Sequence, residues 1–412
     1  MCFSMTRILY IGSGIPWKGG AGYLVRQSLF LRALSHAADE LHLAIFDADG
    51  AERPAFAASL THLPMPPRTR SSRLSSLFED RFSPQPRMMR GYNLQASHAA
   101  VAALHPEQFD AVFAFRIDFA YFAGVLNHPR LILDIDDPEH VRQYRRIRAT
   151  TGGEGDHRTQ RDLLKLRHFE HDAVAHAKLA FVCQANDSQG WPTEPLVVPN
   201  CVDVLPNPPR RATSRRIIFV GNCTGSANSP NVDAVQYFFA KIWPKILSHV
   251  PDAEFRIVGA TSDTVAQMAA KSERVQLAGF VSDLSAEYAE AAISVAPIRF
   301  GTGTRIKILE AFAHACPVVS SLPGAEGIAA VPGREIELAA GAGDLVSRCI
   351  DLLRDAELRE RIGQGGHALA RRLYDSAAQH PRIVALLRDF LETHRAPPAT
   401  EPAVATAAAE VG

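Results

Sequence analysis

Charged side chains gather at an expected helix start within residues 297–311. Two glycines follow an apolar strand pattern at 293–297 and free the backbone, and a helical pattern begins at Thr304. Arg305 and Lys307 place two cations in the first turn, where positive charge opposes the helix dipole. Helix starts offer unpaired N–H groups and a partial positive charge, which suit phosphate. The combination therefore favours anion binding over a purely structural role.

A carboxylate on the same expected helix extends this interpretation. Glu310 follows Lys307 by three residues, so both lie on nearly the same face. A carboxylate at that depth could accept hydrogen bonds from a pair of sugar hydroxyls. Together these residues predict a nucleotide diphosphate site with a ribose anchor. An ordinary surface Lys–Glu pair is the alternative that spacing alone leaves open.

Two α/β halves must position these residues. A strand, loop, helix and strand rhythm begins at Arg7–Gly12 and starts again at Arg216–Gly221, with a helix expected over Asn231–Leu247. Helical stretches separate most strands, which is typical of parallel sheets covered on both faces. Ligands of open α/β sheets bind beyond the carboxyl ends of the strands, so we expect loops from both halves to form the site.

The proline-rich stretch Leu205–Arg211 marks the boundary between the halves, because its prolines cannot continue a helix or a central strand. We expect five parts: an N-terminal Rossmann-like domain (1–204), a linker (205–215), a C-terminal nucleotide-binding Rossmann-like domain (216–375), a helix returning to the N-terminal domain (376–395), and a disordered tail (396–412).

Composition excludes several classes of protein. The 412 residues contain 44 Lys plus Arg and 44 Asp plus Glu, and zero net charge argues against nucleic-acid binding through bulk charge. The six cysteines form no CxxC pair, which argues against a zinc finger. No apolar run reaches the roughly 18 residues of a membrane-spanning helix. We therefore expect a cytoplasmic protein.

The N-terminal half offers candidates of its own at strand ends. Gly19 and Gly20 lie between a strand and a helix, where glycine lets a backbone approach phosphate or sugar closely. Other polar candidates follow the strands expected at 111–115 and 131–135, namely Arg116, Asp118, Asp136 and Asp137. We expect Gly19 and these four residues to face the cleft between the two halves.

The loop Pro64–Arg90 carries six arginines together with leucine, phenylalanine and methionine. Two interpretations stay open. It is a solvated loop, the default for a charged segment, or it contacts anionic lipid, because clustered arginines with apolar residues favour membrane surfaces.

Residues 297–311 resemble the donor site of family 4 glycosyltransferases with the GT-B fold. The resemblance spans residues 216–375 and rests on separated motifs in the family's order: Phe219–Gly221, Pro230–Ala234, Phe255–Gly259, Gly279–Val281, Pro317–Ser320 and Gly324–Ile328. The N-terminal half is most similar to a branch linked to bacterial exopolysaccharide assembly. The resemblance implies an α/β GT-B architecture, with two Rossmann-like domains facing each other across a cleft.

The resemblance also assigns roles. Glu310 matches the second glutamate of the family's E-x7-E motif, which binds the donor ribose, and Arg305 and Lys307 would hold the diphosphate. The first glutamate, which usually contacts the donor sugar, falls at Thr302. The donor-binding residues would be Gly20, Gly221, Thr302, Gly303, Thr304, Gly324, Ala325 and Glu326. The N–H groups of Gly303 and Thr304, and those near Gly324 and Ala325, would help to hold the diphosphate. The acceptor-side candidates, in the N-terminal acceptor-side domain, would be Gly19, Arg116, Asp118, Asp136 and Asp137.

The implied activity is that of a retaining hexosyltransferase, which moves a sugar from a nucleotide diphosphate donor to a glycan or lipid-linked acceptor in cell-surface or exopolysaccharide synthesis. The resemblance implies neither a cofactor nor a metal, although Asp134–Asp137 resembles the manganese-binding DxD motif of the other glycosyltransferase fold. We expect no nucleic-acid partner, and peripheral contact with the inner face of an anionic membrane. Two alternatives remain: a non-catalytic nucleotide- or glycan-binding protein, and an epimerase of the same fold.

Overall fold

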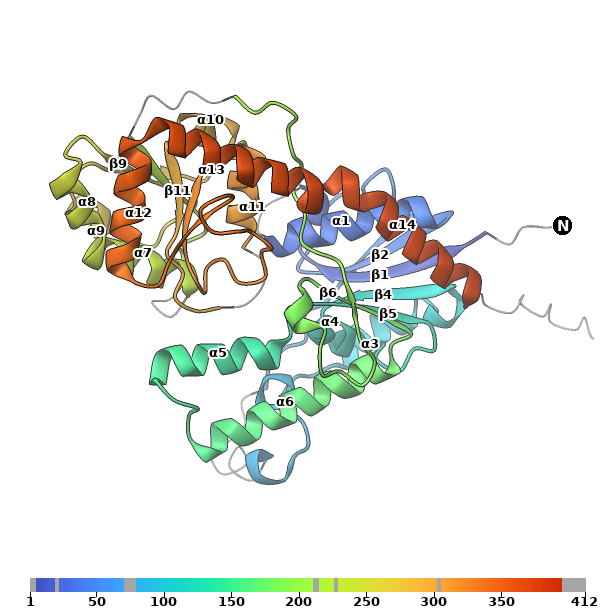
Figure 1. Ribbon diagram of the computed structural model, residues 1–412. Coiled ribbons are helices and arrows are strands. Elements are labelled where there is room, and N and C mark those ends of the chain that lie inside the picture. Colours follow the sequence, from blue (N-terminus) through green and yellow to red (C-terminus); the bar gives the residue numbers. More distant parts are fainter. Residues whose placement is uncertain are drawn as a thin grey trace, which may run out of the picture.

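The computed structural model describes residues 5–18, 22–69, 79–209, 215–225, 229–301 and 305–394. They form two parallel β-sheets, each covered by helices (Figure 1). Five predicted site residues lie outside this described part, namely Gly19, Gly20, Thr302, Gly303 and Thr304. The expected disordered tail, residues 396–412, lies outside it as well.

The N-terminal sheet has seven strands in the order β3-β2-β1-β4-β5-β6-β7. Its strands are β1 Arg7–Ser13, β2 Glu40–Phe46, β3 Ser59–Leu63, β4 Ala111–Phe115, β5 Leu131–Asp136, β6 Leu179–Val182 and β7 Leu196–Val197. Its helices include α1 Gly22–Ala37, α3 Gln95–Ala102, α4 Ile117–Ala123, α5 Glu139–Thr151 and α6 His157–His176. β4 is buried along its whole length, as its unbroken apolar run requires in a sheet covered on both faces.

The C-terminal sheet has six strands in the order β10-β9-β8-β11-β12-β13. Its strands are β8 Arg216–Val220, β9 Glu254–Val258, β10 Val275–Gly279, β11 Ile293–Ala296, β12 Val318–Ser321 and β13 Glu337–Ala339. Its helices include α7 Pro230–Lys241, α8 Trp243–His249, α9 Asp263–Ala270, α10 Ser285–Glu290, α11 Ile306–Ala313, α12 Ala342–Arg354 and α13 Ala356–Leu369. In both sheets the strand order reverses direction next to the first strand, where open α/β sheets bind ligands.

Two chain crossings connect the sheets and lie against each other. The Val202 N–H donates to the Tyr374 carbonyl and the Ser376 N–H to the Val202 carbonyl, both at 2.9 Å. After the second crossing, α14 (Ser376–Thr393) runs back over the N-terminal sheet and packs against α1 (Figure 1). Ile383 and Leu387 of α14 are fully buried in that sheet's core.

Several elements differ from those expected. The single helix predicted over Asn231–Leu247 is wrong, because α7 ends at Lys241 and α8 begins at Trp243. Pro244, the second residue of α8, has no N–H to continue the hydrogen bonds of α7. Part of the expected loop Pro64–Arg90 is helical, at residues 79–82. None of the described helices has the length and apolar character needed to span a membrane.

Candidate functional site

A cavity of about 440 Å³ lies at the carboxyl ends of β8 and β9. Its wall includes Gly22 at the start of α1, so both domains contribute to it. Its other lining residues come from four parts of the C-terminal domain: Val220, Gly221, Asn222 and Asn231; Val258, Gly259 and Ala260; Phe280, Val281 and Leu284; and Arg305, Ile306, Lys307 and Glu310. The structure thus brings together the three predicted catalytic residues and Gly221.

The start of α11 carries the cations of this cavity. The Lys307 ammonium donates to Asn231 Oδ1 at 2.8 Å and lies 4.0 Å from the centre of the Phe219 ring. Burial, with Arg305 nearby, lowers the pKa of Lys307 to about 7. A Cβ on Gly221, the residue after β8, would lie 2.9 Å from the ammonium, so any larger residue there would displace the Lys307 side chain.

Glu310 lies one turn along α11 and lines the same cavity. Burial raises the pKa of its carboxyl to about 7, and Lys307 opposes that rise. Apolar residues of α11, among them Leu309 and Phe312, are buried in the core behind it and fix the helix. The cavity therefore offers two cations to a bound dianion and one carboxylate to a pair of neighbouring hydroxyl groups.

Arg305 is the residue immediately before α11. Burial lowers the pKa of its guanidinium, while Asp137 of the N-terminal domain and Glu326 oppose that fall. No described residue accepts a hydrogen bond from its buried Nε. Arg305 therefore presents a cation toward the junction of the two domains.

The loop after β12 does not offer the free backbone donors that we expected. The N–H groups of Gly324 and Ala325 both donate to the Ser321 carbonyl, at 3.0 and 3.2 Å. The next residue, Glu326, instead forms an ion pair with Arg145 of α5, Oε1 to Nη2 at 2.6 Å. This pair joins the two domains beside the cleft.

The acceptor-side candidates lie at the ends of β4 and β5. Arg116 and Asp136 both have a left-handed backbone, with φ of 62° and 60°, which residues other than glycine rarely adopt. Such strain is common at functional sites. Arg116 pairs with Asp118 at 3.2 Å and lies 3.7 Å from Glu139. Burial, then the charge of Asp137, raises the pKa of Asp136 to about 6.

One described group has the spacing of metal ligands. The ligand atoms of Asp136, Asp137 and Cys183 lie within 4.8 Å of one another. The Cys183 thiol donates to Asp137 Oδ1 at 3.2 Å, and this hydrogen bond brings two of the three groups together.

Sequence reasoning missed the ion pair beneath the acceptor side. Arg26 of α1 and Asp134 of β5 are both fully buried and joined by a bidentate contact, with Arg26 Nε at 2.8 Å and Nη2 at 2.6 Å. Arg26 Nη1 also donates to the Val198 carbonyl at 2.8 Å. The pair thus ties α1 and β5 to the chain that leads into the first crossing. No sequence signal relates two residues so far apart.

Comparisons with known proteins agree with this architecture. Residues 214–355 match the family model described as glycosyl transferases group 1. No curated protein sequence matches the chain. One structural match is HepE from Anabaena with UDP and glucose, at 15% identity and a TM-score of 0.62, covering 94% of this chain and 100% of that chain. Sucrose-phosphate synthase from Thermosynechococcus elongatus matches at 15% identity and a TM-score of 0.69, with the same coverage of both chains. An S. aureus TarM mutant with Fondaparinux, α-GlcNAc-glycerol and UDP matches at 11% identity and a TM-score of 0.66, covering 93% of this chain and 100% of that chain.

Because these proteins share little sequence identity with the chain, their structural similarity shows its fold and nothing finer. The chain has the GT-B architecture, two parallel-sheet α/β domains with a cleft between them, and its C-terminal domain carries the match to group 1 glycosyl transferases.

Proposed function

We propose that this protein is a retaining glycosyltransferase that uses a nucleoside diphosphate sugar as donor. The observation that carries the proposal is the placement of Lys307 and Glu310 in one cavity at the carboxyl ends of β8 and β9. UDP is the nucleotide we expect, because UDP is bound in the HepE and TarM structures.

In the proposed reaction, the bond between the sugar C1 and the β-phosphate oxygen breaks while an acceptor hydroxyl bonds to C1 and passes its proton to the departing diphosphate. Arg305 and Lys307 stabilise the charge that develops on the leaving diphosphate. Their cations are worth more in a buried site than in water, since little solvent screens them. Glu310 accepts hydrogen bonds from the ribose hydroxyls and orients the donor.

The acceptor would bind on the N-terminal side of the cleft. Arg116, Asp118, Asp136 and Asp137 lie at the ends of β4 and β5 and supply charged groups for a polar acceptor. We propose a glycan or lipid-linked acceptor in cell-surface polysaccharide synthesis, reached at the cytoplasmic face of a membrane.

Thermal-shift binding of UDP, GDP and ADP tests the donor site directly. We expect UDP to raise the melting temperature of the wild type but not of Glu310→Gln or Lys307→Met. Glu357→Gln, an exposed glutamate on α13, is the matched control and should keep the shift. A UDP shift of wild-type size in Glu310→Gln would remove Glu310 from the site, and no shift with any nucleotide would oppose the donor assignment.

A second candidate is a non-catalytic protein that binds a nucleotide sugar. It is motivated by Thr302, which replaces the glutamate expected to contact the donor sugar. Turnover separates the two, since a transferase releases UDP from a UDP-sugar when the acceptor is present, whereas a binding protein gives a thermal shift without release.

A further inference from the structure

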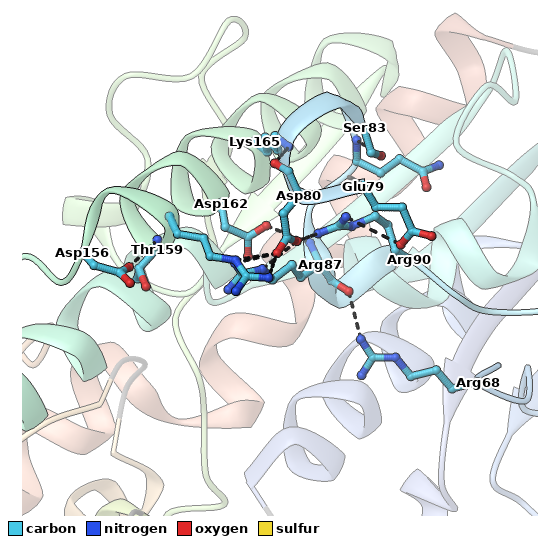
Figure 2. A network of polar contacts seen from close by, with 12 residues as sticks. Arg68, Glu79, Asp80, Ser83, Arg87, Arg90, Asp156, Thr159, Asp162 and Lys165 are labelled. Carbon is cyan, nitrogen blue, oxygen red and sulfur yellow. Dashed lines mark hydrogen bonds and ion pairs between the residues drawn. The ribbon is translucent and has the colours of Figure 1, made fainter. Parts of the chain in front are cut away.

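Two segments far apart in the sequence form one basic surface on the N-terminal domain. They are residues 79–90 and the hairpin of α5 and α6, residues 139–176, and we call them together the hairpin surface. The Lys165 ammonium of α6 donates to the Asp80 carbonyl at 2.7 Å and so joins the two segments. Figure 2 shows the short helical turn that carries Asp80 lying across α6.

A single carboxylate organises the cations of this surface. Asp80 accepts hydrogen bonds from Arg87 Nε at 2.8 Å, from Arg158 Nε at 2.6 Å and from Arg90. Burial opposes ionisation, but these three guanidinium groups hold the pKa of Asp80 well below its usual range. The Asp80 carboxylate thus holds three guanidinium groups together. Because it neutralises only one of them, this cluster keeps an excess of positive charge.

The excess extends over the whole hairpin surface. Residues 79–90 and 139–176 contain eleven Arg and Lys against eight Asp and Glu, in a chain of zero net charge. Six of these cations are exposed to solvent: Arg81, Arg146, Arg148, Arg158, Arg161 and Arg167. Large apolar side chains are exposed among them, Phe82 at 65% and Leu164 at 55%.

We propose that the hairpin surface docks on an anionic lipid membrane, which deepens the proposed function and rests on it. Guanidinium groups bind phosphate oxygens through two parallel hydrogen bonds, and each cation near an anionic bilayer contributes about 1 kcal/mol. Exposed phenylalanine and leucine gain by entering the interfacial layer of a bilayer. A nucleic acid would satisfy the cations and its bases stack on phenylalanine, but it offers no apolar layer to Leu164.

The position of the hairpin surface relative to the cleft supports a lipid-linked acceptor. Met88 and Met89, which belong to the surface, line a small cavity together with Arg116, Asp118 and Asp137. Docking through residues 79–90 would therefore bring the acceptor-side candidates close to the lipid headgroups. An acceptor carried on a lipid could then enter the cleft without leaving the membrane.

Co-sedimentation of the full chain with vesicles tests the proposal. We expect the protein to pellet with phosphatidylcholine vesicles that contain phosphatidylglycerol, but not with pure phosphatidylcholine vesicles, and to be released by high salt. The triple variant Arg146→Glu, Arg148→Glu, Arg161→Glu should partition at least tenfold more weakly. The matched control reverses three exposed arginines of the C-terminal half, Arg334, Arg371 and Arg372, and should partition like the wild type.

Equal binding to neutral and anionic vesicles, or wild-type partitioning by the triple variant, would overturn the proposal. Tighter binding to a DNA oligonucleotide of matched charge than to anionic vesicles would replace the membrane with a nucleic acid. The UDP thermal shift keeps the two proposals distinguishable, and the triple variant should keep the shift of the wild type. In the wild type, a normal UDP shift with no vesicle binding would reject only the membrane, whereas vesicle binding without any UDP shift would reject only the donor site.

Discussion

Asn231 at the start of α7 holds the Lys307 ammonium of α11, with 2.8 Å between Oδ1 and Nζ. The Asn231 amide also donates to the Asn222 carbonyl in the loop after β8, at 2.9 Å. One side chain therefore links the β8 loop, α7 and α11 at the cavity. Asn231 is a positioning residue for the cation that we assign to the diphosphate.

Replacing Asn231 should weaken nucleotide binding through Lys307. A hydrogen bond to a charged group is worth about 1.5–3 kcal/mol, so Asn231→Ala should lower UDP affinity by roughly ten- to hundredfold. Loss of the Asn231 Oδ1 atom also favours the neutral amine of Lys307. UDP affinity should therefore begin to fall at a lower pH in the variant than in the wild type. Calorimetric titration with UDP at several pH values measures both effects.

Ser229→Ala is the control for this variant. Ser229 caps the same helix start, where its hydroxyl accepts from the Val232 N–H at 3.3 Å. Loss of a cap costs about 1 kcal/mol of stability without touching Lys307. An equal loss of UDP affinity in both variants would show that α7 stability, rather than the Lys307 contact, controls binding.

The charge of Lys307 should make UDP binding dependent on pH. Its pKa is about 7 in the empty site, because burial disfavours the cation. A bound diphosphate favours the cation and raises that pKa, so binding above pH 7 takes up a proton and UDP affinity falls as pH rises. Glu310, with a pKa of about 7, is already mostly ionised at pH 8 and adds little there.

Calorimetry at pH 8 in two buffers of different ionisation enthalpy measures this proton uptake. The binding enthalpy of the wild type should change with the buffer. In Lys307→Arg the guanidinium keeps its charge, so the dependence on buffer should disappear. A wild-type enthalpy that is the same in both buffers would contradict the shifted pKa.

Parts of this site could be predicted from sequence because they are local. The order of Arg305, Lys307 and Glu310 along one helix start indicates an anion site, and the structure places all three in one cavity. The strand–helix rhythm likewise predicts the parallel sheets. The N–H groups of Gly324 and Ala325, in contrast, donate to the Ser321 carbonyl, because the loop turns back on itself. That turn depends on the path of the loop, which composition does not reveal.

Contacts between distant segments could not be predicted. Arg145 and Glu326 meet only because the domains face each other, and Asp80 gathers arginines from two separate segments. The sequence shows that such charges exist. Their pairing depends on how helices pack, which a single sequence does not encode in any local pattern.

Breaking the buried pair of Arg26 and Asp134 should strongly destabilise the N-terminal domain. Arg26→Met leaves the Asp134 carboxylate buried without its partner, and breaking a buried pair costs about 3–5 kcal/mol. Arg32→Met is the control on the same helix, since the Arg32 side chain is 50% exposed and lies 3.7 Å from Asp203. Its loss should cost below about 1 kcal/mol.

Urea unfolding of both variants measures this difference. The double variant Arg26→Met, Asp134→Leu should recover much of the lost stability, because replacing both partners by apolar groups removes the unpaired charge. A double variant no more stable than Arg26→Met would show that packing around Arg26, rather than the unpaired carboxylate, causes the loss.

The last helix should stabilise the N-terminal domain although it follows the C-terminal one in the chain. Leu387 of α14 is fully buried in the core beside α1, and truncating a buried leucine to alanine costs about 2–5 kcal/mol. Leu386, its neighbour, is only partly buried, so Leu386→Ala should cost clearly less. Because the cavity is lined almost wholly by the C-terminal domain, both variants should keep the affinity of the wild type for UDP. Thermal unfolding with and without UDP tests this division. Leu387→Ala should lower the unfolding temperature of the N-terminal domain, while UDP still raises that of the C-terminal domain. Loss of the UDP shift in Leu387→Ala would mean that α14 also supports the donor site.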